Sequence, residues 1–148
     1  MTFLKWMLVS IVTVFIAGCS TGQQATQPTS TSTDTEVVQS EAVYQTLSID
    51  ELINVVDNEA DQYTIVNVHI PYAGEIPNTD ENIAYNDVDA LTSALPDKNA
   101  PIILYCRSGN MSETASRELV ALGYTHVYDI PGGMNAWQSN GRELEFTK

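Results

Sequence analysis

The chain has 148 residues, of which 43% are hydrophobic and 17% are charged. This composition is typical of a globular protein and excludes a disordered or collagen-like chain. Nineteen acidic residues against six basic ones give a formal net charge of −13 at pH 7. Such an acidic surface repels phosphate backbones, which argues against nucleic-acid binding. Two cysteines and two histidines leave few ligands for a structural zinc site, and we expect no metal and no organic cofactor.

The N-terminus has the features of an export signal. Lys5 precedes an apolar run from Trp6 to Ala17, which is too short for a membrane span of about 20 residues but typical of a signal peptide. The run ends in Ile16-Ala17-Gly18-Cys19, which resembles the bacterial lipobox, whose cysteine is acylated and becomes the mature N-terminus. We predict a lipoprotein signal peptide over residues 1–18 and lipidation of Cys19. The alternative is an ordinary signal peptide.

This prediction places the protein at the bacterial cell envelope, held by lipid, with its folded part outside the cytoplasm. In a cell with two membranes the folded part would lie on the periplasmic side. Ser20 follows the cysteine, whereas an aspartate there favours retention at the inner membrane, so we expect the outer membrane. The N-terminal lipid is the only membrane contact that the sequence predicts.

A polar segment follows the signal. Fourteen of the 21 residues from Ser20 to Ser40 are Ser, Thr or Gln, and such a segment cannot offset the entropy cost of ordering the chain. We predict a flexible tether over residues 19–43 and one folded domain over residues 44–148.

The first half of the domain alternates helices and strands. Ser48 and Glu51 form a predicted capping box, after which apolar residues recur at helical spacing up to Val56. Short β-branched or apolar runs predict strands over Thr64–Val68 and Ile83–Tyr85, and a helix should follow from about Val88 to Leu95.

The second half repeats the alternation. The continuous apolar run Ile102–Tyr105 is typical of a central strand that is buried on both faces. We expect a helix from about Ser112 to Leu122 that ends at Gly123, a strand over Val127–Ile130 and a short helix over Asn135–Ser139. Alternating strands and helices predict an α/β fold, with a central parallel sheet flanked by helices on both faces.

The candidate site begins at Cys106, directly after the most hydrophobic strand. Ligands of parallel sheets bind at the carboxyl ends of the strands. A short loop with Gly109 leads into the next helix, so its backbone N–H groups can form an anion-binding nest next to the positive end of the helix dipole. These donors, and the charge of Arg107, favour a thiolate at Cys106 over the thiol that an ordinary cysteine would be at pH 7. The alternative is a buried structural cysteine.

The cysteine count supports a reactive sulfur. If Cys19 is lipidated, Cys106 is the only thiol and has no internal partner for a disulfide in an oxidising compartment. A single nucleophile without a resolving cysteine suits chemistry in which a persulfide carries the sulfur.

Four segments in order resemble the single-domain rhodanese-like family. They are Ile65–Val68, Gly74–Pro77, the Cys-Arg-Ser-Gly-Asn-Met-Ser loop over residues 106–112, and the Pro-Gly-Gly-Met-Asn-Ala-Trp segment over residues 131–137. The resemblance implies a rhodanese-like fold and a persulfide on Cys106. This persulfide would be loaded from thiosulfate or a polysulfide-like donor and passed to a thiol or cyanide-like acceptor.

The substrate-binding loop consists of the six residues after the cysteine. They are Arg107, Ser108, Gly109, Asn110, Met111 and Ser112. We expect their backbone N–H groups to form the cradle, with Arg107 assisting by its charge and Ser108 by its hydroxyl. A different class of function is also open, in which the domain is a non-catalytic binding module or a persulfide carrier at the cell envelope. The sequence indicates neither a protein partner nor an oligomeric state.

Several positions depart from the family pattern. Asn67, His69, Glu75 and Met111 stand where the family usually has Asp, Arg, His and often Arg. Three of these changes remove positive charge or a proton carrier, which argues against the dianion thiosulfate as the donor. Ser112 occupies the position where related dual-specificity phosphatases have a phosphate-clamping Arg, so phosphatase activity is not expected.

The remaining candidates have structural interpretations. His69, which changes together with Asn67, is expected to replace a structural Asp–Arg contact rather than to act at the site. His126 is expected at the surface, and Arg117 is expected to pair with Glu113 one helical turn away.

Three further predictions concern the loops. Gly132 and Gly133 should serve a turn that needs positive φ, and Trp137 should pack that turn onto the core. Tyr72 and the acidic segment 75–81 should form a solvated loop that rims the site.

Overall fold

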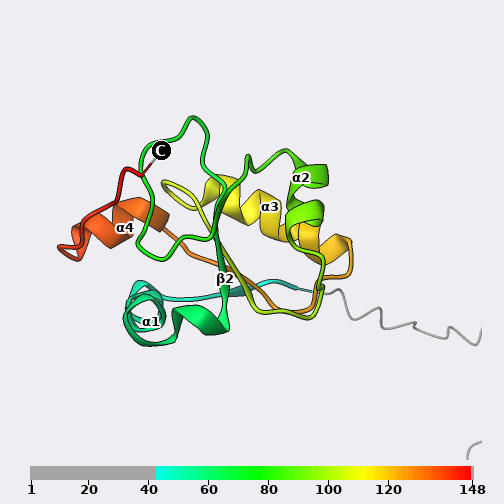
Figure 1. Cartoon of the computed structure of the whole chain (residues 1–148), viewed down its shortest axis with the longest axis horizontal. Coiled ribbons are helices and arrows are strands. Elements are labelled where there is room, and N and C mark those ends of the chain that lie inside the picture. Colours follow the sequence, from blue (N-terminus) through cyan, green and yellow to red (C-terminus); the bar gives the residue numbers. More distant parts are fainter. Residues whose placement is uncertain (1–42, 148) are drawn as a thin grey trace, which may run out of the picture. The chain divides into compact units, whose positions relative to one another are not determined.

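The computed structural model describes residues 43–147. The predicted signal peptide, Cys19 and all of the tether except Val43 lie outside the described residues. Five strands form one parallel sheet in the order β1-β5-β4-β2-β3, with helices on both of its faces (Figure 1). The predicted α/β fold with a central parallel sheet is therefore confirmed.

The first half of the domain contains β1 (Gln45–Thr46) and α1 (Ile49–Asn54). The predicted capping box is confirmed, because Ser48 and Glu51 cap each other's backbone N–H groups. A π-helical turn, η1 (Val55–Glu59), and a 3₁₀ turn, η2 (Ala60–Gln62), continue α1 to the start of β2 (Thr64–Asn67).

The next strand differs from the prediction. β3 spans Glu81–Asn82, whereas we expected a strand over Ile83–Tyr85. Ile83 and Tyr85 follow β3, are half-buried and pack against the core, and their N–H groups still donate to the carbonyls of Asn67 and Val68.

The second half contains α2 (Val88–Ala94), β4 (Ile102–Tyr105), α3 (Asn110–Ala121), β5 (Val127–Asp129) and α4 (Gly133–Ser139). All four residues of β4 are buried, as predicted for a central strand. α3 and α4 each start two residues earlier than expected, because Gly109 and Gly132 take up left-handed conformations as their N-caps.

The sheet separates two hydrophobic clusters (Figure 1). α2 and α3 pack on one face, where Leu91 and Leu119 are completely buried. α1 and α4 pack on the other, where Leu52 and Trp137 are completely buried. Residues of β4 alternate between the two clusters, so the strand that leads to Cys106 is held from both sides.

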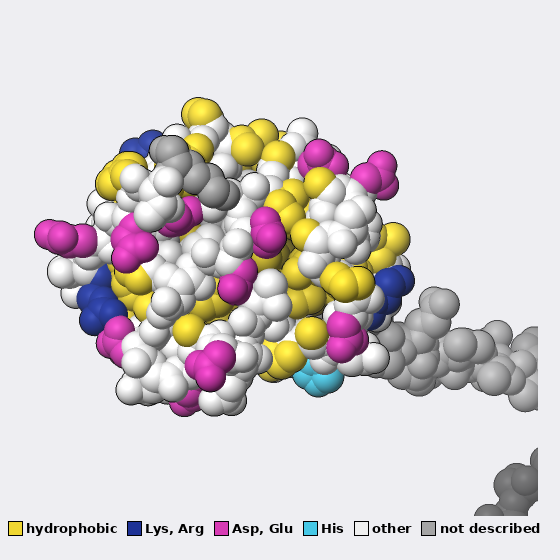
Figure 2. Space-filling view, viewed as in Figure 1, with side chains coloured by type: hydrophobic (Ala, Val, Ile, Leu, Met, Phe, Trp, Pro, Cys, Tyr) yellow, Lys and Arg dark blue, Asp and Glu magenta, His cyan; other side chains and the backbone are white. Residues whose placement is uncertain are grey.

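Within residues 43–147, no helix combines the length and the apolar character that a membrane crossing requires. Acidic side chains are spread over the visible face, while basic side chains appear only towards its edges (Figure 2). This distribution matches the acidic composition.

Candidate functional site

Cys106 lies directly after β4, at the carboxyl end of the sheet, and its sulfur faces the start of α3. The backbone N–H of Gly109 donates to Sγ over 3.1 Å. The hydroxyl of Ser112 lies 3.7 Å from the same sulfur. The Gly109 N–H therefore points at Sγ, and the Ser112 hydroxyl, which also lies 3.0 Å from the Gly109 carbonyl, can reach the sulfur as a second donor. This arrangement favours a sulfur anion.

The loop turns into α3 at Gly109. Its φ of +103° is unfavourable for residues with a side chain, and it lets the chain bend back so that the Gly109 N–H reaches the sulfur. The first N–H groups of a helix have no partner within that helix. The amides at the start of α3, which begins at Asn110, therefore add positive potential on the side of the loop.

The loop rests on the Gly-Gly turn that begins α4. Met134 N–H donates to the carbonyl of Cys106 over 2.9 Å, and Asn135 N–H donates to the carbonyl of Arg107 over 3.0 Å. The positive φ values predicted for Gly132 and Gly133 are confirmed at +83° and +47°. A second requirement was not predicted from sequence, since a Cβ on Gly133 would lie 2.0 Å from the Cys106 carbonyl oxygen.

The side chains of the loop point in different directions. Arg107, Ser108 and Asn110 are exposed, whereas Met111 is half-buried against the core. Cys106 itself is only 1% exposed. The sulfur thus sits behind the loop, whose polar side chains face solvent.

His69 lies at the end of β2, next to the loop. Asn67 accepts from the backbone N–H of His69 over 3.0 Å and donates to the carbonyl of Gly74 over 3.1 Å. Its side chain therefore fixes backbone and does not contact the imidazole, so the expected side-chain contact is not made. The buried Nδ1 of His69 has no hydrogen-bond partner within residues 43–147. Burial, and then the charge of Arg107, lower the pKa of His69.

The acidic segment 75–81 is only in part the solvated loop that we expected, since Asp80 and Glu81 are exposed but Glu75 is not. Glu75 is buried, pairs its backbone with Glu145 and binds Asn82 and Thr147 through its carboxylate. Ile76 is buried too, and the Asp80 carboxylate accepts from the backbone N–H of Ile65 in β2. The charge pattern predicted solvation because it does not reveal these tertiary hydrogen bonds. Tyr72 is half-buried.

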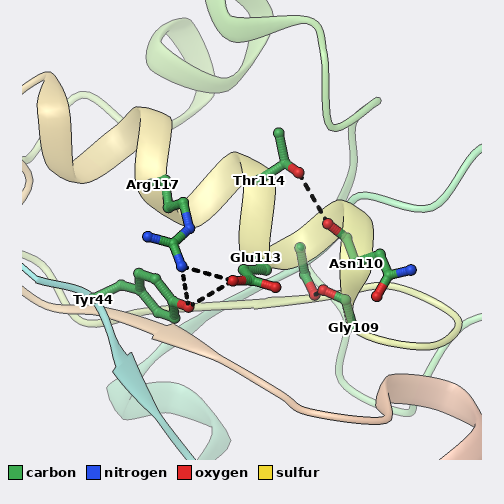
Figure 3. Close-up of polar contacts among 7 residues, drawn as sticks. Tyr44, Gly109, Asn110, Glu113, Thr114 and Arg117 are labelled. Atoms are coloured by element: carbon green, nitrogen blue, oxygen red, sulfur yellow. Dashed lines mark hydrogen bonds and ion pairs between the residues drawn. The ribbon is translucent and has the colours of Figure 1, made fainter.

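A polar cluster near the start of α3 contains one predicted pair. Arg117 binds Glu113 over 2.7 Å, as predicted, and both also contact the hydroxyl of Tyr44 (Figure 3). The guanidinium lies 5.2 Å from the centre of the Tyr44 ring. The residues just before β1 are thereby attached to the helix that carries the site.

Two predictions for other residues are confirmed. Trp137 is completely buried and donates through Nε1 to the carbonyl of Glu143 over 2.8 Å. His126 is exposed. Among the described residues, no three His, Cys, Asp or Glu side chains are grouped as they would be to hold a metal ion.

Comparisons with known proteins agree with this architecture. A family model described as a rhodanese-like domain matches residues 38–140. The chain is 36% identical over 85 residues to the thiosulfate sulfurtransferase GlpE of Pseudomonas fluorescens, covering 57% of this chain and 71% of the relative. It is 35% identical over 92 residues to the adenylyltransferase and sulfurtransferase UBA4 of Candida albicans, covering 60% of this chain but only 19% of that relative.

Solved structures share the fold. A rhodanese-like domain protein from Staphylococcus aureus matches with a TM-score of 0.53 and 28% identity, covering 69% of this chain and 99% of that one. A rhodanese-related protein from Thermoplasma volcanium matches with a TM-score of 0.57 and 24% identity, covering 68% and 97%. The family model spans both the cysteine loop and the Gly-Gly turn on which it rests, and the chain therefore belongs to the rhodanese-like domain family.

Proposed function

We propose that the protein is a sulfurtransferase that carries sulfane sulfur as a persulfide on Cys106. The observation that carries this proposal is the placement of Sγ, which receives the Gly109 N–H over 3.1 Å and faces the Ser112 hydroxyl at the start of α3. These donors stabilise a thiolate before the reaction and the persulfide anion after it. Two relatives whose names state sulfurtransferase activity support the same chemistry.

The transfer has two steps. The Cys106 thiolate attacks the sulfane sulfur of the donor, a new S–S bond forms, and the donor's own bond to that sulfur breaks, releasing its remainder as an anion (sulfite when the donor is thiosulfate). The thiol or cyanide-like acceptor then attacks the outer sulfur of the persulfide. The S–S bond breaks, and the Cys106 thiolate returns.

The donor is a small sulfur-containing anion. Three of the four basic side chains within residues 43–147 are engaged: Arg117 with Glu113, Arg142 with Asp57, and Lys98 with the carbonyl of Leu122. The Arg107 side chain is exposed and has no hydrogen bond or ion pair to another described residue, so it is available to an anion. Because the net charge of −13 repels a dianion such as thiosulfate, we favour a polysulfide-like donor that carries a single negative charge.

One observation supports a second candidate, a persulfide carrier or binding module that does not turn over. Cys106 is 1% exposed, and a sulfur so enclosed would exchange slowly with bulky partners. Under this alternative the domain takes up sulfur but releases it only to a specific partner.

Mass spectrometry of the chain after incubation with thiosulfate or with polysulfide tests both candidates. The sulfurtransferase requires a mass increase of one sulfur atom on the peptide containing Cys106, its removal by cyanide, and its absence in Cys106→Ser. An adduct that forms but resists cyanide and small thiols would support the carrier. A thiol that takes up no sulfur from either donor would contradict the sulfurtransferase and the carrier, and would support the non-catalytic binding module.

We further propose that Cys19 is acylated and anchors the protein to the cell envelope. The support is the sequence Ile16-Ala17-Gly18-Cys19 after a short apolar run, and the acyl chains would provide a stable anchor. Labelling of cells with a palmitate analogue should mark the wild-type chain but not Cys19→Ala. Label that persists in this variant would contradict the anchor without affecting the sulfurtransferase proposal.

A further inference from the structure

Asp129 is a buried acid beneath the cysteine loop, and the proposed sulfur transfer does not use it. It ends β5 and is paired in register with Leu104 of β4, two residues before Cys106. Val127, Leu104 and Cys106 all belong to the hydrophobic cluster under α3. Because alternate residues of a strand share a face, the Asp129 carboxyl also lies on this side. It is only 4% exposed.

The Ser112 hydroxyl connects this carboxyl to the sulfur. Ser112 is completely buried in the first turn of α3. Its Oγ lies 3.0 Å from the Gly109 carbonyl and 3.7 Å from Cys106 Sγ, and the hydroxyl is also near enough to the Asp129 carboxyl to oppose the rise of the Asp129 pKa. A hydroxyl has a single proton to donate, so these three acceptors compete for it.

The Asp129 carboxyl is poorly satisfied for a buried charge. Its Oδ1 is enclosed and has no hydrogen-bond partner within residues 43–147. Burial raises the pKa of Asp129 above its ordinary value, which the Ser112 hydroxyl and the N–H of Ile130 oppose. Asp129 therefore binds a proton, and becomes neutral, more readily than a surface aspartate does.

The charged and titratable groups around Asp129 are few. From α3, the negative charge of Glu113 adds a further rise to the pKa of Asp129. Glu113 itself stays ionised, because its hydrogen bonds with Arg117 and Tyr44 lower its pKa. Tyr44, just before β1, has a raised pKa and stays neutral. On the other side of the loop, His69 has a lowered pKa.

We propose that Asp129 is a positioning residue whose charge decides which acceptor receives the Ser112 proton. When Asp129 is neutral, its O–H donates to Ser112 Oγ, and the Ser112 proton remains available to the Cys106 sulfur anion. When Asp129 is ionised, it takes the Ser112 proton for itself, and its charge opposes the anion. Asp129 thereby sets the pH range in which Cys106 reacts. This inference depends on the proposed function in one respect only, that Cys106 is the reactive sulfur.

Asp129→Asn tests the inference, because the amide can donate to Ser112 at every pH and carries no charge. The full-length chain in mild detergent is alkylated with iodoacetamide across a pH series from about 5 to about 10. The modified fraction is measured by mass spectrometry on the peptide that contains Cys106. We expect the midpoint of the rate profile to move to lower pH by about one unit, and alkylation at pH 7 to be roughly three- to tenfold faster.

Four further variants make the result specific. Glu118→Gln removes one charge from the exposed face of α3 and should leave the midpoint unchanged. Asp129→Asn combined with Ser112→Ala should shift the midpoint of Ser112→Ala by less than Asp129→Asn shifts that of the wild type, because only the direct effect of the charge remains. Asp129→Ser, which removes the charge but keeps a donor, should behave like Asp129→Asn, and circular dichroism identifies variants that are folded.

The outcomes separate cleanly. An unchanged midpoint in folded Asp129→Asn, slower alkylation, or a shift equal to that of Glu118→Gln overturns the inference. A shift that is as large without the Ser112 hydroxyl as with it overturns the role of Ser112. If the midpoint shifts as expected but the wild-type chain takes up no sulfur from either donor, the proposed function fails and the role of Asp129 stands.

Discussion

Replacing Gly133 by alanine should uncouple the cysteine loop from the turn that supports it. A Cβ at this position would lie 2.0 Å from the Cys106 carbonyl oxygen, whereas real Cβ contacts are essentially never under 3.0 Å, so the two segments must separate by roughly 1 Å. Alanine at a φ of +47° costs about 1–2 kcal/mol for its backbone conformation. The separation also breaks the bonds from Met134 and Asn135 to the loop carbonyls, which contribute about 1 kcal/mol each and more if the groups stay unsatisfied.

The expected loss is therefore about 3–6 kcal/mol in the free energy of unfolding. Gly123→Ala is a matched control, because Gly123 also has a positive φ, of +92°, but nothing lies within 4 Å of its Cβ position. The control should lose only about 1–2 kcal/mol. Urea unfolding measures both losses, and alkylation of Cys106 below the unfolding transition should be faster in Gly133→Ala, because the loosened loop exposes the sulfur. Equal losses in both variants, with alkylation at the wild-type rate, would refute the reasoning.

Two further predictions concern buried polar groups. Tyr105→Phe removes the hydroxyl that accepts from the buried N–H of Ile76 over 2.9 Å and should cost about 1–3 kcal/mol in urea unfolding; a loss under about 0.5 kcal/mol would show that water or another acceptor replaces it. The lowered pKa of His69 means that its imidazole binds a proton more readily in the unfolded chain than in the folded one. The folded protein therefore loses stability as the pH falls below about 6.5 towards the folded-state pKa of His69. His69→Gln should flatten this loss between about pH 7.5 and 5, and an unchanged pH dependence would contradict it.

The sequence was most informative where a signal is local. The apolar run Ile102–Tyr105 predicted β4 at its observed bounds, and the Ser48–Glu51 spacing predicted the cap of α1. The starts of α3 and α4 were misplaced by two residues, because a glycine N-cap such as Gly109 has no side chain to signal the cap. β1 was not predicted, since a two-residue exposed edge strand has almost no pattern to detect.

For the site, the sequence predicted where the sulfur and its loop lie but not what the loop touches. Glycine at positions 109 and 133 was explained by backbone conformation, yet Gly133 is also required by the closeness of the Cys106 carbonyl. The link between Ser112 and Asp129 spans 17 residues and depends on α3 lying over β5. In the sequence Asp129 is only an acidic residue at the end of a strand, and nothing near it indicates burial.

The contact between the loop and the turn joins two of the four segments that carried the family resemblance, 106–112 and 131–137. The carbonyls of Cys106 and Arg107 accept from the first N–H groups of α4, while Sγ accepts from the loop at the start of α3. One peptide segment thus faces two helix N-termini, with its oxygens towards one and its sulfur towards the other. Any change that tilts this segment weakens both sets of donors together. The reactivity of Cys106 should therefore depend on the geometry of the Gly133 turn, and the faster alkylation expected in Gly133→Ala is the net result of a more exposed sulfur and weaker donors to it.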